Sequence, residues 1–142
     1  MYKMNEVKFR FTDSEAFHMF IYAGDLKLLY FLFVLMFVDI ITGISKSIKN
    51  NNLWSKKSMK GFAKKLLIFC IIILANIIDQ ILQLKGGLLM ITIFYYIANE
   101  GLSIVENCAE MDVLVPEQIK DKLRVIKNDS EKSDNNERPR ED

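Results

Sequence analysis

The sequence predicts an all-α membrane protein with three transmembrane helices, a short cytoplasmic amphipathic helix and a disordered charged tail. Apolar residues gather into three blocks between residues 28 and 105, each long enough to cross a bilayer as a helix. A lysine-rich stretch without acidic residues separates the first two blocks, and the last fifteen residues contain no aliphatic or aromatic side chain. Because the 51% hydrophobic content is ordinary by itself, the prediction depends on how these residues are distributed.

Composition excludes several classes of function. A net charge of +1 lacks the basic surplus of a nucleic-acid-binding domain, so no nucleic-acid partner is expected. Cys70 and Cys108 lack the CxxC spacing of common zinc sites, and His18 is the only histidine. The sequence has no Gly-rich phosphate loop, GxSxG or HExxH motif. We therefore expect no catalytic, cofactor-binding or metal-binding residues, and a protein that is not an enzyme.

The N-terminal segment, residues 1–27, precedes the first apolar block. It carries four basic and four acidic side chains and several phenylalanines. Aromatic side chains favour the boundary between membrane and water. This segment is therefore predicted to be extracytoplasmic or interfacial.

The first apolar block, residues 28–48, would reach roughly 31 Å as a helix, at about 1.5 Å per residue. Its thirteen Leu, Ile, Val and Phe residues outweigh the insertion cost of roughly +3 kcal/mol expected for Asp39. The second block, residues 66–84, also contains thirteen such residues. The third, residues 88–105, contains nine, and Asn99 and Glu100 reduce its hydropathy, so this span is expected to depend on helix partners.

A soluble helical bundle is the alternative to this membrane domain. Each helix of a small soluble bundle needs a polar face toward water. The first two blocks contain the runs LLYFLFVLMFV and LLIFCIIIL, which are apolar on every side of a helix. The residues therefore favour a multi-pass membrane protein, with the lipid bilayer as its solvent.

Charge predicts the orientation of the spans. The loop between the first two blocks carries seven lysines, and the positive-inside rule places it in the cytoplasm; they are Lys46, Lys49, Lys56, Lys57, Lys60, Lys64 and Lys65. The next loop, residues 85–87, is short enough for an antiparallel hairpin on the far side. Three crossings then leave the N-terminus outside and the C-terminus in the cytoplasm. The lysines could serve topology alone or could also bind anionic lipid.

The C-terminal third follows the last span on the cytoplasmic side. Residues 106–127 are predicted to hold a cytoplasmic helix in which Ile119, Leu123 and Ile126 recur at i, i+4 and i+7. This stripe could lie on the membrane surface, pair with another copy or pack under its own helices. Residues 128–142 are charged and rich in asparagine, which predicts a disordered tail.

Each span also carries polar residues at helical spacing, and two interpretations of them remain open. In the first, Asp39 and Glu100 are buried and hydrogen-bonded to Thr42, Ser103 or Asn99, holding the bundle together. In the second, the polar strips line a water-filled path between several copies. The candidates for either role are Asp39, Thr42, Gly43, Asn76, Asp79, Asn99, Glu100, Ser103 and Glu106.

Several short motifs occur together in a fixed order over roughly residues 28–123. They are DIITG at 39–43, the lysine stretch at 55–65, NIID at 76–79, NEGLSIVEN at 99–107 and VPE at 115–117. In this combination the sequence resembles the phage holin family of the toxin-secretion and phage-lysis type (TcdE-like holins).

The resemblance implies a small protein of the cytoplasmic membrane that forms homo-oligomers and opens lesions. In phages such lesions release or activate an endolysin, and in toxin loci a related protein helps a large toxin to leave the cell. An antiholin is a further partner that the resemblance suggests. The rival functions are an antiholin or membrane docking subunit, and a small ion channel or transporter.

Overall fold

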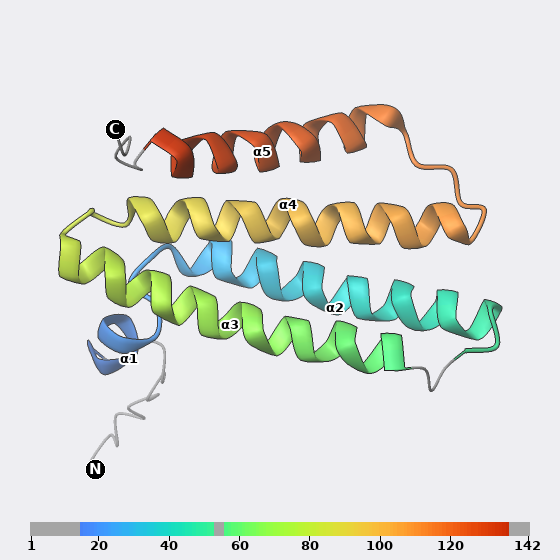
Figure 1. Ribbon diagram of the computed structural model, residues 1–142, viewed down its shortest axis with the longest axis horizontal. Coiled ribbons are helices and arrows are strands. Elements are labelled where there is room, and N and C mark those ends of the chain that lie inside the picture. Colours follow the sequence, from blue (N-terminus) through green and yellow to red (C-terminus); the bar gives the residue numbers. More distant parts are fainter. Residues whose placement is uncertain (1–14, 53–55, 137–142) are drawn as a thin grey trace, which may run out of the picture.

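The computed structural model describes residues 15–52 and 56–136, and these residues form helices and turns without strands. The helices are α1 (Glu15–Phe20), α2 (Leu26–Lys49), α3 (Lys56–Leu82), α4 (Gly87–Glu110) and α5 (Glu117–Asn136). Helix α4 lies between α2 and α3 on one side and α5 on the other (Figure 1). The all-α class predicted from the sequence is confirmed.

Three of these helices are long and apolar enough to cross a bilayer: Leu26–Lys49, Met59–Leu82 and Gly87–Glu110, each 24 residues long. At about 1.5 Å per residue, each such segment measures roughly 36 Å. Large apolar side chains cover the outer surfaces of α2 and α3 and remain exposed, among them Phe31, Phe37, Leu67, Leu74 and Ile81. Contiguous apolar surface of this extent suits contact with lipid rather than with water.

The bundle core is apolar and is centred on α4. Leu89 and Ile93 of α4 are fully buried against Leu32 of α2 and Ile72 of α3. On α2 the buried residues recur every three or four positions, and Leu89, Ile93, Glu100 and Asn107 of α4 also lie on one side of their helix. The remaining circumference stays apolar, which agrees with the prediction from the first two blocks.

Helix α3 begins at Lys56, ten residues before the predicted start of the second span. The prediction that residues 56–65 form a loop was therefore wrong. This stretch contains no proline, and alanine, lysine and methionine all favour helices, so Gly61 alone does not interrupt it. The connection from α2 to α3 is correspondingly short.

A tight turn joins α3 to α4. It comprises residues 83–86, and Gly87 is already the first residue of α4. Gln83, Lys85 and Gly86 have positive φ angles, and glycine tolerates the left-handed region best. The hairpin predicted between the second and third spans is therefore present, but α3 ends two residues earlier and α4 begins one residue earlier than expected.

Helix α5 continues to Asn136, nine residues into the segment that was predicted to be disordered. Two serine hydroxyls within that extension donate to backbone carbonyls four residues earlier: Ser130 Oγ to Ile126 at 2.8 Å and Ser133 Oγ to Asp129 at 3.0 Å. No glycine or proline lies between residues 117 and 136. Residues 137–142 of the predicted tail lie outside the described part of the chain.

Only part of the apolar stripe predicted for this helix contacts the bundle. Leu123 packs on α4, whereas Ile119 and Ile126 remain 49% and 37% exposed. The buried side of α5 includes Ser130 instead. Periodicity located the helix but not the side of it that contacts the bundle.

Candidate functional site

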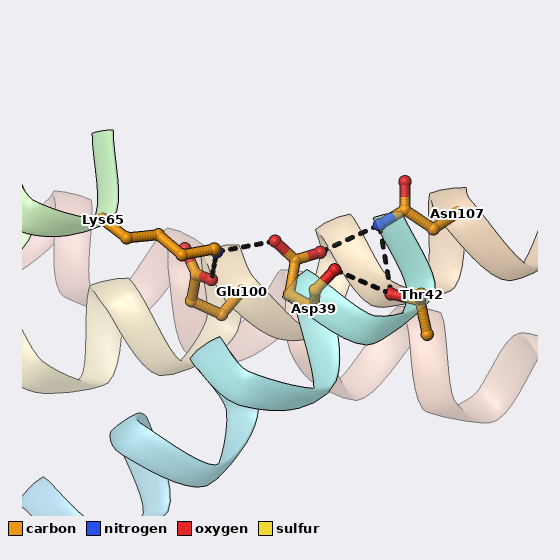
Figure 2. A network of polar contacts seen from close by, with 5 residues as sticks. All are labelled: Asp39, Thr42, Lys65, Glu100 and Asn107. Carbon is orange, nitrogen blue, oxygen red and sulfur yellow. Dashed lines mark hydrogen bonds and ion pairs between the residues drawn. The ribbon is translucent and has the colours of Figure 1, made fainter. Parts of the chain in front are cut away.

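Five polar side chains from three helices meet inside the bundle (Figure 2). Lys65 of α3 donates from Nζ to Asp39 Oδ2 of α2 at 2.7 Å and also to Glu100 Oε2 of α4. Asn107 of α4 donates from Nδ2 to Asp39 Oδ1 at 3.0 Å and to Thr42 Oγ1 at 3.1 Å. We refer to Asp39, Thr42, Lys65, Glu100 and Asn107 as the central cluster.

The central cluster lies well within the length of the spans. The last turns of α2 and α4 and the first turns of α3 form one end of the bundle, which we call the lysine-rich end. Asp39 and Glu100 precede the ends of α2 and α4 by ten residues, so both lie about 15 Å from this end. Lys65 follows the start of α3 by nine residues, which places it at the same level. All three charged residues are at most 9% exposed. The cluster is therefore withdrawn from both lipid and bulk water.

Helical periodicity explains why these residues converge. Asp39 follows Leu32 and Met36 on the buried stripe of α2, at spacings of seven and three residues. Glu100 and Asn107 continue the stripe that begins at Ile93 on α4. The same positions that bury apolar residues nearer the hairpin thus bury charged residues nearer the lysine-rich end.

The electrostatics of the cluster favour a fixed arrangement of the three spans. One lysine faces two carboxylates, so with every group ionised the cluster carries one net negative charge. Removing such charges from water is costly and is offset only when every charge has well-placed partners. No buried side-chain nitrogen or oxygen of the described residues lacks a hydrogen bond. The cluster joins α2, α3 and α4, and nothing in its geometry resembles a catalytic arrangement.

The sequence-based candidates divide between this cluster and other places. Asp39 and Glu100 are buried, as the packing interpretation expected, but their carboxylates accept from Lys65 and Asn107 instead of the expected partners. Thr42 Oγ1 donates to the Asp39 backbone carbonyl at 3.1 Å. Asn99 and Ser103 are half-buried and do not hydrogen-bond to the cluster. The four remaining candidates lie outside the cluster: Gly43 lies beside the Asn107 side chain, Glu106 is exposed, and Asn76 and Asp79 lie near the turn between α3 and α4.

The basic partner of the cluster was missed by the sequence analysis. Lys65 was assigned to a solvated loop together with six other lysines, but it is 9% exposed inside α3. A signal did exist: it is the last lysine before an uninterrupted apolar run, three residues before the buried Ile68. Its register on the buried stripe of α3 could have separated it from its neighbours.

The other lysines lie at the lysine-rich end. Lys46 pairs with Glu110 at 2.6 Å, and Lys49 pairs with Asp112 at 2.6 Å, joining the last turns of α2 and α4. The Lys49 ammonium holds the pKa of the Asp112 carboxyl below its usual range by hydrogen bonding and charge attraction. Lysines also suit helix C-termini because of the helix dipole. On the first turns of α3, the side chains of Lys56, Lys60 and Lys64 are exposed, and Lys57 lies on the same turns.

A second polar group, which we call the hairpin cluster, lies where α3 meets α4. Asp79 accepts from the backbone N–H groups of Gly86 at 2.7 Å and Leu89 at 2.9 Å, so its carboxylate caps the N-terminus of α4. Asn76 is fully buried and accepts from the backbone N–H of Ala23 at 3.0 Å. These residues border an open cleft of about 580 Å³ between the hairpin and the start of α2.

Helix α1 is attached to the same end of the bundle. Asn76 and Gln80 both donate to the Met19 carbonyl, at 3.3 Å and 2.6 Å. The Tyr22 hydroxyl donates to the Asp25 carbonyl at 2.9 Å, and the Tyr22 ring is 1% exposed. The polar residues of α3 therefore fasten the segment before α2 rather than line an open path in this structure.

Tyr22 should make the stability of this corner depend on pH. Burial, with a smaller contribution from Asp25, raises the pKa of Tyr22 from 10.0 to about 12. A raised folded-state pKa stabilises the protein fully below the unfolded value, and this stabilisation is lost as pH rises from about 10 to 12. Tyr22→Phe should show a shallower alkaline loss in detergent unfolding titrations, and about 1 kcal/mol less stability at neutral pH for the missing hydrogen bond. Equal slopes in the two proteins would contradict this role.

Comparison with known proteins places the chain in a family. The model of the bacteriophage holin family matches residues 16–128. A probable holin from Bacillus phage phi105 is 44% identical over 108 residues, covering 76% of this chain and 80% of the relative. The Bacillus subtilis (strain 168) protein YqxH is 42% identical over 130 residues, covering 92% and 91% of the two chains.

Other bacteria contain similar proteins. A 14.9 kDa protein encoded in the nagH 3' region of Clostridium perfringens is 37% identical over 108 residues, which cover 75% of this chain and 80% of the relative. No solved structure matches this chain significantly. Together with three helices that can span a membrane, these matches indicate a multi-pass membrane protein. The chain therefore belongs to the bacteriophage holin family, which is not a family of enzymes.

Proposed function

We propose that copies of this chain assemble in the bacterial cytoplasmic membrane and open lesions through which an endolysin reaches the cell wall. One observation carries the proposal: in a member of the holin family, three bilayer-length helices present apolar surface outward and bury a charged cluster between them. Similarity to a probable phage holin supports lysis rather than toxin export as the outcome. The partners in this proposal are other copies, the lipid bilayer and the endolysin, with an antiholin as a regulator.

The orientation in this proposal follows from the lysines. The positive-inside rule places the lysine-rich end of the bundle in the cytoplasm and the hairpin end outside. The N-terminus then lies outside, and the turn from α4 to α5 begins in the cytoplasm. The exposed lysines of α3 would meet the anionic surface of the inner leaflet, which attracts basic side chains.

The central cluster would keep the three spans of each copy packed together, and we call this arrangement the closed state. Its buried charges are satisfied within one chain, so a lesion requires that they exchange partners or meet water. A net negative charge inside the membrane also responds to the membrane potential, at about 2.3 kcal/mol per charge and 100 mV for a full crossing. Asn99, Ser103 and Glu106 of α4 lie outside the cluster and are the proposed contacts between copies.

Expression with and without an endolysin tests the proposal. Cells that contain a cytoplasmic reporter enzyme should release it abruptly when this chain accumulates, and should lyse only when the endolysin is also present. An antiholin or docking subunit would cause no release when expressed alone. An ion channel would abolish the membrane potential without releasing the enzyme. Release of a large toxin in intact, unlysed cells would favour export over lysis.

Asp39→Asn should bring forward the time at which expressed protein stops growth. The substitution removes one of the two carboxylates that hold Lys65 and places an amide N–H₂ group near its ammonium. Losing a hydrogen bond to a charged group weakens the closed state by about 1.5 to 3 kcal/mol. Growth arrest is timed at matched membrane protein levels, with Asp112→Asn as the control because that carboxylate is exposed and outside the cluster. Unchanged timing would remove Asp39 from the mechanism.

A further inference from the structure

Helix α5 lies along α4 instead of projecting away from the bundle (Figure 1). Leu123 sits over Gly101, where a Cβ atom would come within 2.7 Å of the leucine Cδ2. Further along, the Lys127 ammonium lies 5.7 Å from the centre of the Tyr95 ring. Gly101 and Tyr95 both belong to the middle of a bilayer-length span, so this contact extends to the depth of the hydrocarbon core.

The composition of α5 does not allow lipid on its outer side. Ten of its twenty residues are charged, five basic and five acidic. The exposed ones include Asp121, Lys122, Arg124, Asp129 and Lys132. Charged side chains at this depth are found facing protein or water, because contact with hydrocarbon is too costly. A single copy surrounded by lipid could therefore not keep α5 against α4.

The two sides of the molecule differ in the medium that they suit. The outer surfaces of α2 and α3 are apolar, with Phe37, Leu67 and Ile81 all more than 60% exposed. Helix α5 covers the opposite side of α4 (Figure 1), and the charged residues of α5 named above are exposed. A ring of copies can satisfy both sides at once, with α2 and α3 toward lipid and α5 toward an enclosed volume of water.

We propose that α5 forms the water-facing wall of the assembled lesion while it remains packed on α4 of its own chain. This inference rests on the proposed function and adds the element that lines the opening. Its outer charges supply the polar lining that the three apolar spans lack. Because the five basic and five acidic residues of α5 cancel, the helix has no net charge, and the opening should discriminate little between anions and cations.

A disulfide between α4 and α5 tests whether the two helices stay together. The pair Gly101→Cys and Leu123→Cys replaces the close glycine–leucine contact, in a background in which Cys70 and Cys108 are serine. The protein is reconstituted at high density into phosphatidylethanolamine and phosphatidylglycerol vesicles that contain a fluorescent dextran. It is then oxidised or reduced. We expect an intramolecular cross-link and equal dextran release in both states.

The other possible outcomes contradict either the inference or the proposed function. A cross-linked protein that releases dextran only after reduction would show that α5 must leave α4, and would overturn the inference. Failure to form the cross-link in vesicles would overturn it as well. If the cysteine-free parent releases nothing in either state, the proposed function itself fails, because no lesion then exists for α5 to line.

Ion selectivity supplies a second readout that a merely structural role would not change. Asp121→Lys with Asp129→Lys makes the outer face of α5 basic without touching Leu123 or Lys127. Reversal potentials measured across planar bilayers should shift toward anion preference. Lys85→Glu, at an exposed position in the turn between α3 and α4, is the control and should leave the preference unchanged. No shift in the α5 variant would place the helix outside the conducting path.

Discussion

Lys65→Met is expected to lower the free energy of unfolding by about 3 to 5 kcal/mol, the largest effect of any single substitution considered for this chain. The methionine fills a similar volume but leaves the Asp39 and Glu100 carboxylates buried without their shared cation. Two unpaired like charges at this depth should also separate α2 from α4. The loss can be measured by titrating detergent-solubilised protein with SDS and following the reactivity of the half-buried Cys108 thiol.

Two matched variants separate charge from packing. Lys65→Arg keeps the positive charge and should lose much less stability than the methionine variant. Adding Asp39→Asn and Glu100→Gln to Lys65→Met makes the cluster neutral and should recover most of the loss, since a buried ion group can often be replaced by neutral residues at little cost. If Lys65→Met alone were as stable as the unaltered chain, the central cluster would have no structural role.

Asp79→Ala is expected to cost about 2 to 4 kcal/mol. One carboxylate accepts from two backbone N–H groups at the start of α4, those of Gly86 and Leu89, and each would lose its partner in a largely buried place. An unsatisfied buried donor costs about 1 to 3 kcal/mol. The substitution also removes a negative charge from a helix N-terminus, where the helix dipole favours it.

Hydrogen exchange of the two amides locates this effect. Both the Gly86 and Leu89 amides should exchange faster in the Asp79→Ala protein, whereas amides of the central cluster should be unchanged. Asp79→Asn retains one acceptor oxygen and should lie between the alanine variant and the unaltered chain. Gln80→Ala is the neighbouring control, because the Gln80 side chain is exposed and binds α1 rather than α4. Equal protection of the two amides in the Asp79→Ala, Asp79→Asn and unaltered proteins would show that Asp79 does not cap α4.

Hydropathy and periodicity predicted the three spans because both report local properties of the chain. An apolar block long enough for a bilayer identifies its own helix, and Asp39 and Glu100 could be placed on inward faces because lipid rejects them. Boundaries were less certain where no glycine or proline marks the end. For that reason α3 begins earlier and α5 ends later than the sequence indicated.

The partners of the buried residues could not be predicted in the same way. Which lysine neutralises Asp39 depends on the stagger of α3 against α2, and this follows from packing along the whole length of both helices. The contact of Leu123 with Gly101 likewise depends on the turn that reverses the chain after α4. Neither the pairing of Lys65 with Asp39 nor the contact of Leu123 with Gly101 can be deduced when each helix is considered separately.

The short turn between α3 and α4 bears on how the protein enters its membrane. Only residues 83–86 separate the two helices, and Lys85 is the only ionisable residue among them. The Asp79 carboxylate accepts hydrogen bonds from the two backbone amides that it caps. In the orientation proposed above, the pair would partition into the bilayer as one hairpin. Lys85 would then be the one ammonium group of the turn that crosses, and no hydrophilic domain would have to be translocated between the second and third spans.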